Sequence, residues 1–140
     1  MEDRTEILWR AYQSHLSSSQ HYEEQRSKIT QAVLILSGAV LALLKLGEPN
    51  MFVGTLVAAY LIVVGSFGAF FTHRTAKECN VERNCAQDYL EKLALAVPNT
   101  FEEMEMEEPS FPILPWLLVH GLVVVLGILI LIYGLNHEGR

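Results

Sequence analysis

Two residues near the start of the chain have side chains that could cut a phosphodiester. Arg10 and His15 are separated by four residues. A cationic side chain beside an imidazole can stabilise developing charge on a phosphate and transfer a proton. The same pair can also be a surface arginine next to a histidine at a helix interface. Because this spacing arises easily by chance, the sequence favours the second interpretation over a ribonuclease site.

His120 stands alone as a polar residue inside a long apolar segment, residues 116–135. An ionisable residue within a membrane-spanning segment is a candidate for function. His120 is the fifth residue of the segment, close enough to its start for a functional ring to reach lipid headgroups or water. The alternative, which the sequence favours, is a histidine that packs through a hydrogen bond.

Other motifs for catalysis or metal binding are missing from the sequence. No two histidines stand four residues apart, which is the spacing for a shared metal on a helix. Cys79 and Cys85 are six residues apart and would point to different sides of a helix, so we predict free thiols. There is no G-x-S-x-G nucleophile motif and no phosphate-binding loop. We therefore predict no metal, no cofactor and no enzymatic activity.

Composition points to a membrane rather than to nucleic acid. The 140 residues are 51% hydrophobic and carry 10 Lys and Arg against 16 Asp and Glu, a net charge of −6. Proteins that bind nucleic acid directly need a basic face, which this balance does not supply. The length fits one domain, and we predict a single membrane domain over residues 1–140.

Three apolar segments, residues 29–46, 51–72 and 116–135, are expected to be transmembrane helices. The middle one has 22 residues without a charge, enough to cross a hydrocarbon core of about 30 Å. Gly47 to Asn50 reads as a tight turn, which makes the first two helices an antiparallel hairpin. The predicted fold is an all-α integral membrane protein with three transmembrane helices.

Two amphipathic segments, residues 3–28 and 73–97, extend the first two transmembrane helices into the cytoplasm. Each carries an apolar stripe at helical spacing, which in the first segment includes Ile7, Leu8 and Tyr12. The stripes must be covered, either by each other or by neighbouring copies. Residues 98–115 contain five glutamates and four prolines, and are interpreted as a solvated linker in preference to an interfacial segment.

Small and polar residues recur along the middle apolar segment, residues 51–72. Small residues let another helix approach closely in lipid. They allow two interpretations, packing within one chain or packing between subunits around a pore that the polar members would line. The candidate packing or pore-lining positions are Gly54, Ala58, Gly65, Ser66, Gly68, Ala69 and Thr72.

The basic residues predict the orientation in the membrane. Eight of the 10 Lys and Arg residues lie before the first apolar segment or between the second and the third. Because cytoplasmic segments carry the excess of Lys and Arg, we expect the N-terminus and the long second loop in the cytoplasm. Three crossings then place the C-terminus outside.

The layout resembles the SLATT-type family of small bacterial membrane effectors. The resemblance rests on residues 11–29 with Tyr22 and Arg26, on Phe70 to Ala76, and on Tyr89-Leu90. It implies a cytoplasmic helix, a two-span hairpin and a second cytoplasmic helix, in proteins that damage the inner membrane during antiphage defence. The third apolar segment is a departure from that two-span pattern. Through Arg10 and His15 alone, the chain also resembles the HEPN-like membrane accessories of RNA-targeting CRISPR systems.

These observations lead to one predicted function and two alternatives. The first is an oligomeric inner-membrane effector that permeabilises the membrane when it is triggered through its cytoplasmic helices. The second is a membrane anchor or sensor that recruits a soluble cytoplasmic protein without catalysis. The third and weakest is a membrane-bound ribonuclease. The expected partners are the lipid bilayer, further copies of the chain and a cytoplasmic protein, and we expect no direct contact with nucleic acid.

Overall fold

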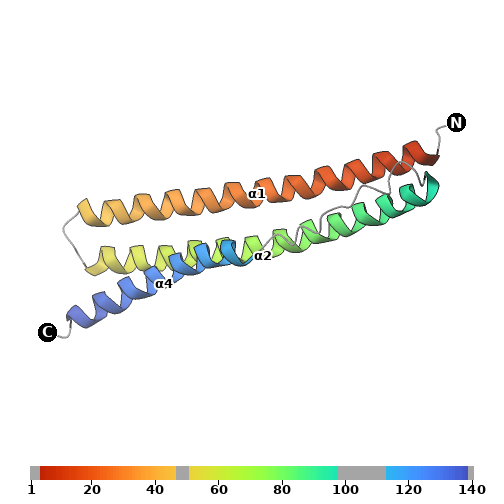
Figure 1. Cartoon of the computed structure of the whole chain (residues 1–140). Coiled ribbons are helices and arrows are strands. Elements are labelled where there is room, and N and C mark those ends of the chain that lie inside the picture. Colours follow the sequence, from red (N-terminus) through yellow and green to blue (C-terminus); the bar gives the residue numbers. More distant parts are fainter. Residues whose placement is uncertain (1–3, 47–50, 98–112, 139–140) are drawn as a thin grey trace. The chain divides into compact units, whose positions relative to one another are not determined.

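The computed structural model describes residues 4–46, 51–97 and 113–138, and all of these except Val97 lie in three long α-helices. Helix α1 is Arg4–Leu46, α2 is Met51–Ala96 and α4 is Ile113–Glu138 (Figure 1). The prediction of an all-helical chain is confirmed for the described residues. Each helix contains a segment that is long and apolar enough to cross a membrane, judged by length and composition.

The helices join segments that the sequence analysis treated separately. Helix α1 covers the predicted segments 3–28 and 29–46 almost entirely, and α2 covers 51–72 and nearly all of 73–97, each without a break. Helix α4 begins at Ile113, three residues before the predicted start. Pro115 is tolerated there because the first N–H groups of a helix have no helical acceptor. The predicted turn at 47–50 and most of the predicted linker, residues 98–112, lie outside the described residues.

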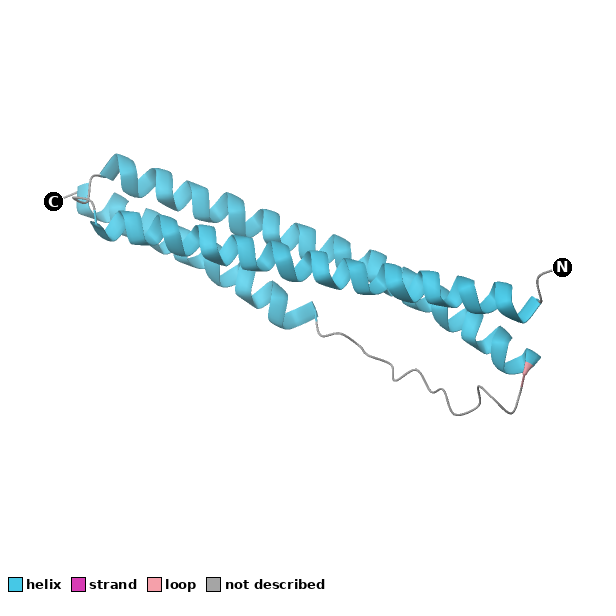
Figure 2. Cartoon of the chain, turned by 90° about the horizontal axis from the view of Figure 1, so that it is seen from above, coloured by secondary structure: helices cyan, strands magenta, loops and turns pink. Residues whose placement is uncertain are grey.

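Contacts within the chain group its residues into two compact units. The hydrophilic unit contains the described residues 4–25 and 74–97, and the apolar unit contains residues 26–46, 51–73 and 113–138. Helices α1 and α2 contribute to both units, whereas α4 belongs to the apolar unit (Figures 1 and 2). Within each unit, α1 and α2 lie side by side and run in opposite directions.

Buried residues recur every seven positions on both α1 and α2. A seven-residue repeat keeps one seam of a helix facing its neighbour and is typical of left-handed coiled-coil packing. Most of the repeated residues are small or polar, so the helices approach closely and few large apolar side chains separate them. The repeat is Tyr12, Ser19, Arg26 and Val33 on α1, and Ala58, Gly65, Thr72, Cys79, Ala86 and Leu93 on α2.

The core of the hydrophilic unit comes from both predicted apolar stripes. Tyr12 of α1 packs with Ala86, Leu90 and Leu93 of α2, which confirms that the two stripes cover each other. The inclusion of Ile7 in the α1 stripe is wrong, because its side chain is 52% exposed. It lies outside the seven-residue repeat that carries the packing.

Polar contacts also join the two helices of the hydrophilic unit. Arg83 donates a hydrogen bond to the Glu23 carboxylate, and the two groups form an ion pair. The Cys79 thiol is buried and donates to the Ser19 carbonyl oxygen at 3.6 Å. If one helix slid along the other, these partly buried polar groups would lose their partners. Such contacts therefore favour one register of the two helices.

All three helices contribute to the core of the apolar unit. Its centre is Val33 of α1, Val57 and Leu61 of α2, and Val123 of α4. The outward faces carry large apolar side chains, such as Ile35 at 71% exposed and Leu122 at 68%. A surface this rich in exposed apolar side chains is suited to hydrocarbon rather than to water.

Candidate functional site

Helices α2 and α4 come close together at three glycines. A Cβ atom built on Gly68 would lie 2.3 Å from Nδ1 of His120, and one built on Gly65 would lie 2.8 Å from Cγ2 of Val124. A Cβ atom on Gly127 would lie 2.9 Å from the carbonyl oxygen of Ala58. These separations are shorter than normal van der Waals contact, so the observed approach requires hydrogen in place of a side chain at these positions.

His120 sits at this contact and connects all three helices of the apolar unit. Its side chain is fully buried, and its Nε2 lies 3.2 Å from Oγ1 of Thr30, in hydrogen-bonding geometry. The opposite side of the ring lies against Gly68. We call Thr30, Gly68 and His120 the histidine site. It takes one residue from each of α1, α2 and α4.

Two buried polar atoms near this contact make no hydrogen bond with any described residue. They are Nδ1 of His120 and Oγ1 of Thr72, which lies one turn after Gly68 on α2. Both residues are 0% exposed. Leaving a buried donor or acceptor unsatisfied costs about 1–3 kcal/mol, so such groups are rare and call for an explanation.

An arginine lies one helical turn from the histidine site. Arg26 precedes Thr30 by four residues, and Trp116 precedes His120 by four. The guanidinium carbon of Arg26 lies 5.1 Å from the ring centroid of Trp116, although Arg26 is only 4% exposed. A guanidinium over an indole ring gains a favourable cation–π interaction. The described residues 26–46, 51–73 and 113–135 of this unit contain no Asp or Glu.

The sequence analysis singled out His120 but did not identify Arg26, Thr30 or Trp116 as site residues. The signal that could have found them is the matched spacing: Arg26 and Thr30 share one face of α1, and Trp116 and His120 share one face of α4. The less favoured alternative, a ring that reaches headgroups or water, does not fit the structure, since the residue is 0% exposed. Its hydrogen bond to Thr30 matches the packing-histidine interpretation.

The predicted small-residue positions on α2 divide into two groups. Ala58, Gly65, Gly68 and Thr72 are buried inside the apolar unit. Ala69 is half-buried, Ser66 is exposed, and a Cβ atom on Gly54 would meet nothing within 4 Å. Gly65 and Gly68 thus pack against α4 of the same chain, which is the first of the two interpretations of this stripe.

Arg10 and His15 pair with different carboxylates. Arg10 donates to Glu6 at 2.6 Å on the exposed side of α1. Nδ1 of His15 lies 2.6 Å from the Glu82 carboxylate on α2, and its ring stacks on Tyr89 with centroids 5.4 Å apart. The geometry of His15 is that of a histidine at a helix interface.

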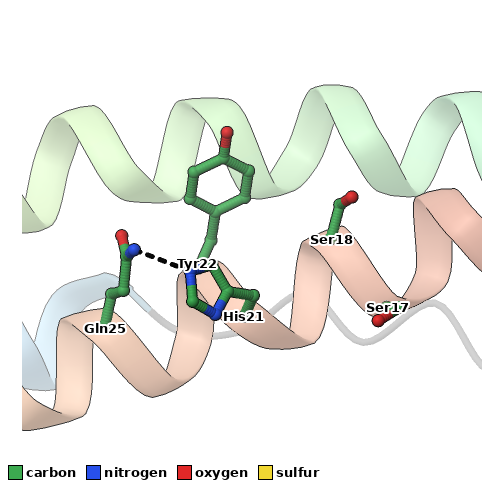
Figure 3. Close-up of a pocket in the computed structure, with 5 residues that line it drawn as sticks. All are labelled: Ser17, Ser18, His21, Tyr22 and Gln25. Atoms are coloured by element: carbon green, nitrogen blue, oxygen red, sulfur yellow. Dashed lines mark hydrogen bonds between the residues drawn. The ribbon is translucent and has the colours of Figure 1, made fainter.

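A groove on the hydrophilic unit is lined by side chains of α1 alone. Ser17, Ser18, His21, Tyr22 and Gln25 surround it (Figure 3). The Gln25 side-chain amide donates to Nε2 of His21 at 2.8 Å. Because every lining residue that the structure describes lies on this one helix, we assign no site there.

The chemical groups of the histidine site are one imidazole and one hydroxyl. Across the described residues, no three His, Cys, Asp or Glu side chains gather in a way that could hold a metal ion. No protein-family model matches the chain, and the searches of curated proteins and of solved structures found no similar protein.

Proposed function

We propose that the protein is a multi-pass membrane effector with a cytoplasmic sensing unit. The hydrophilic unit receives a signal from a cytoplasmic partner, and the apolar unit responds by permeabilising the bilayer. The N-terminus is cytoplasmic and the C-terminus lies outside, in a bacterial inner membrane, where the chain acts in antiphage defence as its resemblance to SLATT-type effectors implies.

One observation carries this proposal: the same two uninterrupted helices build both units. Helix α1 runs from Arg4 to Leu46 and α2 from Met51 to Ala96. A helix without a break passes axial or rotational displacement along its length, because its backbone hydrogen bonds repeat at every residue. A signal received by the hydrophilic unit therefore has a direct covalent and hydrogen-bonded connection to the apolar unit.

The docked position of α4 gives the resting state in this proposal. Helix α4 covers Gly65 and Gly68, the small residues that would otherwise let a helix from another copy approach. Activation displaces α4, exposes this surface of α2 and allows copies to assemble around a path through the bilayer. In the resting state, Gly65 and Gly68 line no pore.

A variant that displaces α4 without any trigger tests the proposal. The full chain carrying Gly127→Leu, which leaves the glycines of α2 unchanged, is reconstituted into phospholipid vesicles loaded with a self-quenched dye. We expect several-fold faster dye release than from the parent chain, because a leucine cannot fit where a Cβ atom alone would lie 2.9 Å from the carbonyl oxygen of Ala58. The matched control is Gly121→Leu, where the position is open, and its release should equal the parent's.

The effector proposal would be contradicted if α4 were displaced and the vesicles still released no more dye than with the parent chain. Displacement is checked separately, by loss of a cysteine cross-link between α2 and α4. A stoichiometric soluble partner that co-purifies with the chain, with no dye release from any variant, would instead support the anchor or sensor function.

A further inference from the structure

We propose that His120 is a proton-binding site, and that proton uptake by its ring releases α4 from α1 and α2. This inference rests on the geometry around the ring and not on any effect of the protein on the bilayer.

The hydrogen bonds of the ring suit a neutral imidazole. A neutral ring has one N–H group and one bare nitrogen, whereas an imidazolium has two N–H groups that both need acceptors. Nε2 is satisfied by the Thr30 hydroxyl, which can accept or donate. Nδ1 has no hydrogen-bond partner among the described residues. In either neutral tautomer, protonation gives an imidazolium with an N–H donor at Nδ1, on the side that faces Gly68, where a Cβ atom would lie only 2.3 Å from Nδ1.

The neighbouring hydroxyl on α2 does not relieve this conflict. Oγ1 of Thr72 is buried and also lacks a partner in the described part of the chain. It is therefore not within hydrogen-bonding geometry of Nδ1 in the docked arrangement.

The charged groups around the His120 ring also disfavour a positive charge on the ring. From α1, the nearest charged group is Arg26, one turn before Thr30, and Lys28 is exposed. From α2, the nearest titratable group is His73, which is exposed and follows Thr72. Helix α4 carries no Asp, Glu, Lys or Arg from residue 113 to 135. The described part of the apolar unit thus offers the imidazolium no Asp or Glu as a counter-ion, and a buried charge without a counter-ion is strongly unfavourable.

Undocking α4 removes both conflicts together. It separates the ring from Gly68 and from Arg26, and it allows Nδ1–H to reach water or lipid headgroup oxygens. The bound ligand of the histidine site is thus a single proton, and its effect is the loss of the contact between α4 and α2.

Trp116 provides a direct reporter of this event. The chain has 2 tryptophans, so Trp9→Phe leaves Trp116 as the sole source of tryptophan emission. The full chain in lipid nanodiscs is titrated from pH 8 to pH 5. We expect a reversible change in the emission of Trp116, because undocking takes its ring away from the Arg26 guanidinium that lies 5.1 Å from its centroid.

Two variants identify the responsible group. His120→Gln keeps an amide to bond Thr30 but cannot take up a proton, so its emission should be constant over the same range. His15→Gln alters the histidine paired with Glu82 in the hydrophilic unit, and it should respond as the parent does. An unchanged response in His120→Gln, or no response of the parent down to pH 5, would overturn the proposal.

Should His120→Gln fail to fold, histidine nitrogen chemical shifts of the parent chain decide the question. His120 must gain its proton over the same pH interval in which Trp116 emission changes. Protonation of His120 without a change in Trp116 emission would contradict the proposed link between proton uptake and release of α4. A change in Trp116 emission without protonation of His120 would also contradict it.

Discussion

Replacing Gly127 by alanine should loosen the contact between α4 and α2. The new Cβ atom would lie 2.9 Å from the carbonyl oxygen of Ala58 and 3.1 Å from Cβ of Leu61. A backbone oxygen cannot rotate away as the end of a side chain can, so the helices must separate. Overpacking of this kind costs about 1–3 kcal/mol. The measurement is the SDS concentration that unfolds the chain in mixed micelles, followed by Trp116 emission in a Trp9→Phe background.

Gly121 on the same helix is the matched control. A Cβ atom at Gly121 meets nothing within 4 Å, so Gly121→Ala should leave the unfolding midpoint unchanged or raise it slightly, since alanine is the better helix former. Equal effects of Gly127→Ala and Gly121→Ala would mean that α4 does not pack on α2 in this way.

Replacing Leu93 by alanine should selectively unfold the hydrophilic unit. Leu93 is 0% exposed and packs with Tyr12, Ala86 and Leu90. Removing a buried leucine side chain costs about 2–5 kcal/mol, which is large for a core this small. Amide hydrogen exchange along residues 4–25 and 74–97 should become much faster, while the apolar unit keeps its protection.

Leu95 provides the control for this prediction. It lies two residues from Leu93 on the same helix but is 83% exposed. Leu95→Ala should change stability by no more than about 0.5 kcal/mol. If both substitutions accelerated exchange equally, the core of the hydrophilic unit would not be centred on Leu93.

The helices and the buried stripes were predictable because both follow from local periodicity. The apolar segments are long, and residues such as Ala86, Leu90 and Leu93 recur at helical spacing, so the buried face of α2 could be identified. Ile7 shows the limit of that method. Apolar character and three- or four-residue steps placed it on the stripe, whereas the seven-residue repeat through Tyr12 excludes it.

The composition of the histidine site could not be predicted from local pattern. Thr30 and His120 are 90 residues apart in sequence, and nothing near either residue specifies the other. The glycines of α2 posed a related difficulty. A small-residue stripe fits any closely packed helix, so Gly65 and Gly68 could equally have faced another copy until α4 was seen to cover them.

A cysteine cross-link tests most directly whether α4 of the same chain covers this stripe. A Cβ atom at Gly127 would lie 3.1 Å from Cβ of Leu61, close to the spacing of about 3.5–4.5 Å found in disulfides. The variant Leu61→Cys with Gly127→Cys, with serine at positions 79 and 85, is oxidised in native membranes. We predict that both thiols become protected at the mass of one chain, and that co-expressed single-cysteine chains form no linked dimer. A disulfide found only between two chains, or two thiols that remain free, would contradict the docking of α4 on its own hairpin.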